Sequence, residues 1–260
     1  MRLHRFYISE PIGSQAEITI INPELINQIR RVFRLKVGDS VILFDGSGSD
    51  YECIIDEFSG ESKIKGDNRS DRGSGPTSMR VHITTTKRSA FLPAREVILC
   101  AAIVKKDTFE WIVEKATELG VTKIIPIMAE RSEKKNLNED RLKKIAIEAS
   151  EQSGRGTIPA IEKIMTLKEI IDVQAGPTCA EPYDHMLAFN IEGKLFEQDE
   201  QGLPSCGSPL FVFVGPEGGW SPDEIDMFHK NKVLVVSLGT QVLRAETAVV
   251  AALSLVLLGK

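Results

Sequence analysis

The pattern of apolar and polar positions changes about a quarter of the way along the chain. Before residue 60 the apolar residues form short runs, at 17–21, 40–44 and 51–55, separated by turn residues. Such runs are typical of strands in a small antiparallel barrel or sandwich. Residues 66–78 are rich in Gly, Ser, Asp and Arg and contain no aliphatic or aromatic side chain, which predicts a linker. We therefore expect two domains, 1–72 and 73–260.

Beyond this segment, strand patterns alternate with helix patterns. The continuous apolar run 97–104 predicts a strand covered on both faces. A helical face follows, which Gly120 should end and a capping box of Asp107 and Glu110 should begin; the face consists of Phe109, Ile112, Val113, Ala116 and Leu119. A strand at 121–128 and a helix ending at Gly154 come next. This order predicts an α/β domain with a mainly parallel sheet.

Two apolar runs near the end of the chain each lead into a loop with glycines. The run 211–214 precedes Gly-Pro-Glu-Gly-Gly-Trp at 215–220, and the run 233–236 precedes Leu-Gly-Thr-Gln-Val-Leu-Arg at 238–244. The carboxyl ends of parallel strands form the usual ligand edge of such a sheet, and glycines let the backbone approach a flat cofactor. Neither loop fits a phosphate-binding fingerprint. Ser221 and Glu224 predict a helix start directly after the first loop.

These two loops, taken together, resemble the 16S ribosomal RNA (uracil-N3) methyltransferase family of the SPOUT superfamily. Further blocks carry the resemblance over nearly the whole chain: 30–39, 43–48, 114–121, 130–132 and 148–155. The resemblance implies a PUA-like β-barrel RNA-binding domain followed by a SPOUT methyltransferase domain with a C-terminal trefoil knot. It also implies S-adenosylmethionine as cofactor and N3 of a uridine in small-subunit ribosomal RNA as methyl acceptor. Free RNA and the assembled 30S subunit both stay open as substrates.

The glycine loops supply the candidate cofactor-binding residues. Apolar side chains would pack on the adenine while free backbone groups read its edges. The candidates are Gly215, Glu217, Gly218, Gly219, Leu238, Gly239, Val242 and Leu243. The alternative is that Leu238, Val242 and Leu243 are ordinary core residues. A branched side chain at Gly218 is expected to block the cofactor.

Three charged residues are candidates for catalysis. N3 of neutral uracil carries a proton, so methylation needs proton removal and stabilisation of the resulting anion. Arg244 is the candidate for holding the carbonyl edge of that anion, and Glu217 is a candidate base or cofactor contact. Glu246 either orients Arg244 or favours the positive end of the helix that it opens.

Candidate RNA contacts are local, because the net charge of −5 argues against a generally basic surface. Arg30, Arg31, Arg34 and Lys36 form a basic cluster without an acid, whose alternative is a merely solvated face. Helical spacing puts Glu151, Gln152 and Arg155 on one face with Glu148, which is typical of a solvated face with intrahelical ion pairs. The resemblance instead favours Glu151, Gln152 and Arg155 in the substrate cleft. Lys105 and Arg131 are further possible phosphate contacts.

Composition narrows the class of protein and its partners. The four cysteines and four histidines are dispersed, so we expect no metal site and reduced thiols in a cytoplasmic protein. The chain has no apolar stretch long enough for a bilayer, and none follows Met1 as a signal core, so we expect no membrane partner. Residues 248–258 are apolar on every helical face, which predicts a homodimer or full burial within one subunit.

Two other functions fit the same residues. One is a SPOUT RNA methyltransferase that acts on a ribose 2′-hydroxyl or on another base. The other is a non-catalytic factor for ribosome assembly that binds ribosomal RNA.

Overall fold

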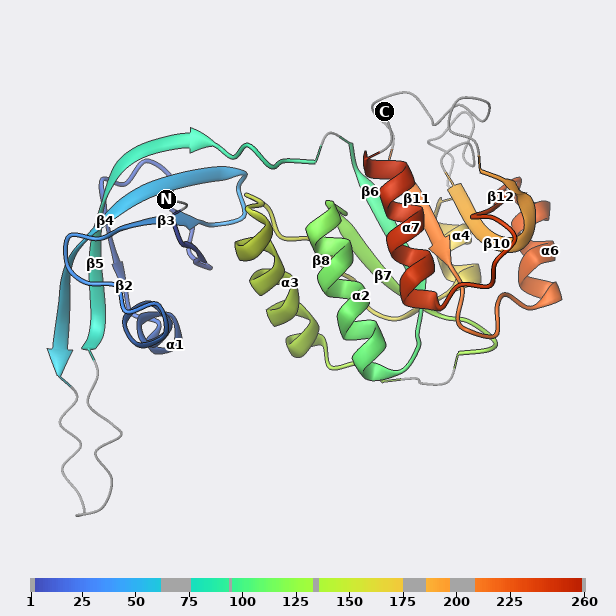
Figure 1. Cartoon of the computed structure of the whole chain (residues 1–260), viewed down its shortest axis with the longest axis horizontal. Helices are drawn as coiled ribbons and strands as arrows, with labels where there is room; N and C mark the ends of the chain where they lie inside the picture. The colour runs from blue at the N-terminus through green and yellow to red at the C-terminus, as the bar shows by residue number, and fades with distance from the viewer. Residues whose placement is uncertain are drawn as a thin grey trace, which may run out of the picture. The chain divides into compact units, whose positions relative to one another are not determined.

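The chain forms two compact units, but the boundary between them does not lie at the predicted linker. The computed structural model describes residues 3–61, 76–93, 95–132, 136–174, 186–196 and 209–258 (Figure 1). One unit is Met1–Leu92 with Gly154–Thr157, and the other is Pro93–Ser153 with Ile158–Lys260. The boundary predicted at 72/73 is therefore misplaced, because β5 (Pro76–Arg88) pairs with β4 (Ser49–Glu61) within the first unit. Most of the predicted linker lies outside the described residues, between two strands of one sheet.

The N-terminal unit is built on a five-stranded sheet in the order β1-β3-β4-β5-β2. Its other elements are β1 (Arg5–Tyr7), β2 (Glu17–Ile20), α1 (Pro23–Asn27), the π-helix η1 (Gln28–Val32) and β3 (Ser40–Phe44). The pairing is antiparallel except between β1 and β3. Inward side chains such as Phe6, Leu43 and Val81 form its buried core. The prediction of a small β domain at the start of the chain is confirmed.

Residues 154–157 belong to the N-terminal unit although they follow a helix of the other unit. The amide of Gly48 donates to the carbonyl of Gly156 at 3.1 Å. Arg5 donates from Nη2 to the carbonyl of Arg155 at 3.0 Å and pairs through Nη1 with Asp50 at 2.7 Å. A Cβ at Gly156 would lie 2.4 Å from Cβ of Ser89, so only glycine allows this close approach.

The C-terminal unit contains a parallel seven-stranded sheet, in the order β12-β10-β11-β6-β7-β8 with β9 also paired to β7. Its elements are β6 (Val97–Ala102), α2 (Lys106–Leu119), β7 (Lys123–Met128), α3 (Glu139–Ser153), β8 (Ala160–Ile161), β9 (Met165–Thr166), α4 (Leu167–Gln174), β10 (Met186–Leu195), β11 (Leu210–Val214), α6 (Pro222–Lys230), β12 (Leu234–Ser237) and α7 (Ala245–Leu258). The mainly parallel α/β architecture is confirmed. The trefoil knot implied by the resemblance stays a prediction.

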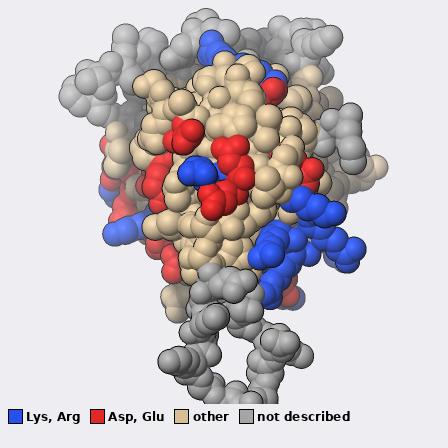
Figure 2. All heavy atoms as spheres, turned by 90° about the vertical axis from the view of Figure 1, so that its left-hand side faces the viewer, with Lys and Arg blue, Asp and Glu red and all other residues tan. Residues whose placement is uncertain are grey.

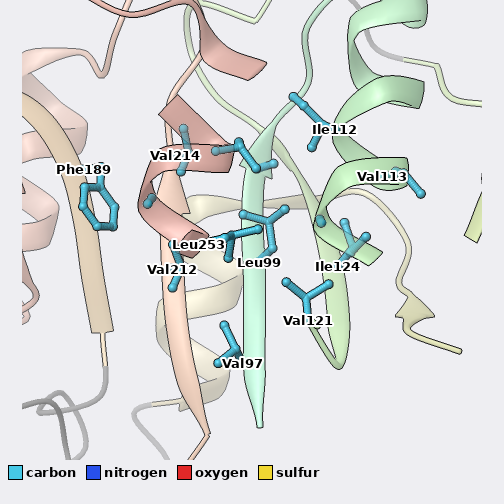
Figure 3. Close-up of a cluster of buried hydrophobic side chains, with 14 of the residues drawn as sticks. Val97, Leu99, Ile112, Val113, Val121, Ile124, Phe189, Val212, Val214 and Leu253 are labelled. Atoms are coloured by element: carbon cyan, nitrogen blue, oxygen red, sulfur yellow. The ribbon is translucent and has the colours of Figure 1, made fainter. Parts of the chain in front are cut away.

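Alternate residues of β6 pack into two separate cores, one on each face of the sheet. Val97, Leu99 and Ala101 belong to the core that α2, α3 and α7 cover; Figure 3 shows Val97 and Leu99 among its side chains. Ile98, Cys100 and Ala102 belong to the core on the other face, which α4 and α6 cover. A strand buried on both faces cannot alternate polar with apolar residues, which explains its continuous apolar run.

Local signals set most of the helix ends. Gly120 ends α2 in the left-handed conformation, with φ 116°. Ser221 and Glu224 form the predicted capping box of α6. The capping box predicted at Asp107 is wrong, because α2 begins earlier, with Lys105 as N-cap and no side-chain cap. Asp107 instead lies in the first turn, where its carboxylate favours the positive end of the helix.

Candidate functional site

A cavity of about 250 Å³ lies at the carboxyl ends of β11 and β12 and beside the middle of β10. It is lined by Phe189, Asn190, Ile191, Val214, Gly215, Pro216, Glu217, Gly218, Gly219, Trp220, Ser237, Leu238, Gly239, Gln241, Val242, Leu243, Ala245 and Ala248. Every residue predicted to bind the cofactor is in this set. The two glycine loops therefore form a single site, as the parallel strand order predicts.

The loop after β11 is held by its own backbone and by a buried tryptophan. The indole of Trp220 donates from Nε1 to the carbonyl of Phe189 at 3.1 Å. A Cβ at Gly215 would lie 3.2 Å from Cε2 of that indole, so glycine lets the loop pass against the ring. Gly219 has φ 66°, and its amide donates to the carbonyl of Pro216 at 2.9 Å. The loop therefore makes a tight turn beside the cavity.

The loop after β12 is organised by Ser237. Its Oγ accepts a hydrogen bond from the amide of Gly239 at 3.1 Å and donates to the carbonyl of the same residue at 2.8 Å. Gly239 has φ 127°, a backbone angle that residues with a Cβ rarely adopt. Val242 is 83% exposed, so it is not a core residue, whereas Leu238 packs partly against the core. An exposed valine at a cavity wall is available to contact a ligand.

The third wall of the cavity was not predicted from the sequence: β10 supplies it through Phe189, Asn190 and Ile191. The pairing of β10 with β12 shifts register between Phe189 and Lys194, so the strand bulges beside the cavity. Gly193 permits this, because a Cβ there would lie 2.5 Å from the backbone of Val236. The signal in the sequence was a third short apolar run, Met186–Phe189, like the runs 211–214 and 233–236, but no glycine-rich loop follows it directly.

The three candidate catalytic residues occupy different positions. Glu217 lines the cavity and is exposed. Arg244 is exposed and lies between Leu243 and Ala245, which both line the cavity, although Arg244 itself does not. Glu246 lies in the first turn of α7. Within the described residues no hydrogen bond joins Glu246 to Arg244, so the structure favours the role of Glu246 at the helix end.

The basic cluster lies where a short helix ends. The amide of Phe33 donates to the carbonyl of Gln28 at 3.0 Å, which closes the π-turn of η1, and Arg34 then adopts φ 56°. Arg30, Arg31, Arg34 and Lys36 are all exposed. The guanidinium of Arg30 lies 5.7 Å from the ring centre of Phe58. Figure 2, a view onto this unit, shows Lys and Arg side chains gathered on one side, apart from a group of carboxylates.

The other predicted RNA contacts differ in their exposure to solvent. Lys105 is exposed at the carboxyl end of β6, and Gln152 is exposed on α3, where Glu151 is half-buried. Arg155 does not share their helical face, which corrects the prediction: α3 ends at Ser153, and Gly154 turns the chain with φ 86°. Arg155 is 3% exposed, and burial lowers its pKa to about 10. Arg131 is exposed and contacts the loop after β11.

The described residues contain neither a cluster of metal ligands nor a membrane-spanning helix. No group of three or more His, Cys, Asp or Glu side chains there could hold a metal ion. No helix in these ranges is long and apolar enough to cross a membrane. Cys53 and Cys100 are buried thiols, and burial raises the pKa of Cys53 to about 12. Cys179, Cys206 and His185 lie outside the described residues.

Comparison with known proteins places the chain in a family. Residues 92–257 match the RNA methyltransferase domain family, and residues 21–62 match the RNA methyltransferase PUA domain. Ribosomal RNA small subunit methyltransferase E of Bacillus subtilis is 31% identical over 90% of this chain and 87% of its own length, and that of Rickettsia conorii is 28% identical over 98% and 95%. A solved methyltransferase from Legionella pneumophila, in complex with the cofactor SAM, superposes with a TM-score of 0.78 at 25% identity, covering 98% of this chain and 97% of its own. The chain therefore belongs to the ribosomal RNA small subunit methyltransferase E family of RNA methyltransferases.

Proposed function

We propose that this protein transfers a methyl group from S-adenosylmethionine to N3 of a uridine in 16S ribosomal RNA. The observation that carries the proposal is the convergence of both glycine loops on one cavity, in a chain of this family. The Legionella relative binds SAM, which is consistent with the same ligand here. A cytoplasmic location is part of the proposal, because the ribosomal RNA substrate is found there.

The cavity residues fit a flat, partly apolar cofactor. Ile191 and Val242 offer exposed apolar surface, and the glycines leave backbone amides and carbonyls accessible at the wall. When bound, S-adenosylmethionine supplies an electrophilic methyl group. The protein contributes chiefly position, because an in-line displacement requires no covalent enzyme intermediate.

The charged residues at the cavity would prepare the uracil. Arg244 would hold the carbonyl edge and stabilise negative charge on the ring as the N3 proton leaves. Glu217 lines the cavity and is the candidate to accept that proton. Arg244 itself does not line the cavity, which is consistent with a side chain that contacts the substrate and not the cofactor.

The decisive experiment is to identify the product. The purified protein is incubated with small subunits, or with free 16S RNA, from cells that lack it, and the digested nucleosides are analysed by mass spectrometry. We expect 3-methyluridine in a cofactor-dependent reaction. A ribose 2′-O-methyl nucleoside would instead assign the alternative SPOUT activity. Calorimetry that detects no binding of S-adenosylmethionine would favour the assembly factor.

The basic cluster is proposed to bind RNA phosphates. Arg34→Gly removes the charge and also relieves the left-handed backbone of this residue. We expect weaker RNA binding and a log–log salt slope lower by roughly one, because one fewer counterion is released. The free energy of unfolding should stay equal or rise. Arg34→Lys, which keeps the charge, should retain the slope; an unchanged slope in Arg34→Gly would identify a merely solvated surface.

The protein is further proposed to be a homodimer that pairs through α7. Val249 and Leu253 are buried in the core, whereas Leu255 and Leu258 are 41% and 64% exposed, so α7 is apolar on a face that its own unit leaves uncovered. A second copy of the chain is the simplest cover for that face. Leu257 packs partly against the core, so a charge there would also disturb the fold of the subunit. Leu255 is exposed, so a charge there tests the dimer alone.

Leu255→Asp is expected to convert the dimer to a monomer and to lower methylation. A carboxylate in an apolar interface loses its hydration without gaining a partner. Sedimentation at micromolar concentration and a methylation assay measure the two effects. Val173→Asp is the matched control, because Val173 is an exposed valine on α4, which covers the other face of the sheet. A fully active wild-type monomer would contradict the dimer.

A further inference from the structure

We infer that Arg131 is a positioning residue for the cofactor loop rather than a contact to RNA. Arg131 follows β7, and its Nη1 donates to the carbonyl of Gly218 at 2.7 Å and to that of Trp220 at 3.3 Å. Both carbonyls belong to the loop that lines the cavity after β11. A single guanidinium nitrogen thus joins the segment after β7 to this loop, across nearly ninety residues of sequence (87 and 89).

The stem of Arg131 contacts the same loop. A Cβ placed on Gly218 would lie 3.4 Å from both Cβ and Cδ of Arg131. Gly218 is not in the left-handed region, unlike Gly219, so its backbone conformation does not require glycine. The stem of Arg131 lies along the loop, at van der Waals distance from the position that a Cβ on residue 218 would occupy.

A second side chain joins the two segments from the opposite direction. Glu224, in the first turn of α6, accepts hydrogen bonds from the amide of Glu130 at 3.0 Å and from the amide of Ser221 at 2.8 Å. Glu224 is 8% exposed, so these bonds are well shielded from water. The pair Glu130-Arg131 is consequently held at both residues, and the loop is fixed over its carboxyl-terminal part, from Gly218 to Ser221.

The value of this arrangement is preorganisation. A loop with glycines at 215, 218 and 219 has high conformational entropy, and ordering it when a ligand arrives would reduce affinity. Arg131 orders the loop beforehand through charge-assisted hydrogen bonds, which are stronger than neutral ones. Its two carbonyl acceptors lie in the cavity wall, so its effect should reach the cofactor and not the RNA.

The test compares Arg131→Met with wild type and rests on the proposed binding of S-adenosylmethionine. In Arg131→Met we expect the dissociation constant and the KM for S-adenosylmethionine to rise about tenfold. The kcat and the KM for RNA should stay near the wild-type values. Amide hydrogen exchange at 218–220 should be faster without cofactor. Arg131→Lys, which keeps one cationic donor, should partly restore the affinity. Arg141→Met on α3 is the matched control and should change none of these.

The outcomes separate this inference from the proposed function. Unchanged cofactor affinity and loop exchange in Arg131→Met would overturn the positioning role, as would a rise confined to the KM for RNA. If Arg131→Met does not fold, Arg131→Lys decides: a weaker cofactor affinity at an unchanged Tm supports the role, and wild-type affinity overturns it. A wild-type protein that binds no S-adenosylmethionine would refute the proposed function itself.

Discussion

Gly219→Val is expected to weaken the binding of S-adenosylmethionine by about a hundredfold, or about 2.8 kcal/mol, while the protein stays folded. Gly219 has φ 66° and lines the cavity, and a Cβ there would meet no protein atom within 4 Å. The branched side chain therefore occupies space beside the cavity, and its backbone strain opens the turn that places the wall. The effect is measured by calorimetry with S-adenosylmethionine.

Gly13→Val is a matched control for backbone strain. Gly13 has φ 59° in the N-terminal unit, and a Cβ there also meets nothing within 4 Å. Both variants should lose a similar free energy of unfolding, roughly 1–3 kcal/mol. Only the variant at 219 should lose cofactor affinity. Equal affinities in the two variants would remove the loop after β11 from the cofactor site.

Arg244→Met is expected to lower kcat by roughly 10²–10³, the usual effect of removing a donor that stabilises developing negative charge. Methionine keeps much of the stem and removes all hydrogen-bond donors. The dissociation constant for S-adenosylmethionine should be unchanged, because Arg244 does not line the cavity. Single-turnover methylation of saturating RNA measures the chemical step.

A lysine at the same position sharpens this experiment. Arg244→Lys keeps the charge and loses the planar pair of donors, so we expect an intermediate rate if the guanidinium holds the uracil edge. A normal rate in Arg244→Met, accompanied by a higher KM for RNA, would identify Arg244 as a phosphate contact instead.

The parts of the fold that sequence predicted are those set by local patterns. The continuous apolar run at 97–104 identified a doubly covered strand, and Gly120 and Ser221 set the ends of their helices. The cavity followed from two strand-to-glycine junctions, because parallel strands bring their carboxyl ends to one edge. Such signals lie within a few residues of one another.

The parts that sequence did not predict depend on distant partners. Helical spacing put Arg155 on the face of Glu151, but Gly154 ends the helix and Arg155 is buried in the other unit. Arg131 was predicted to be a surface cation that contacts phosphate. Its two hydrogen-bond acceptors lie far along the chain, so no local pattern indicates them. The polar segment after residue 66 was predicted to separate two domains, because composition alone does not show that the strands before and after it pair with each other.

The assignment of residues 154–157 to the N-terminal unit has a consequence for synthesis on the ribosome. Gly156 and Arg155 supply carbonyl acceptors to Gly48 and to the buried side chain of Arg5. These acceptors emerge only after residues 93–153 have been translated, and those residues belong to the other unit. Until then a buried guanidinium lacks one of its partners, which is costly. The N-terminal unit therefore cannot complete its native contacts before well over half of the chain has been made.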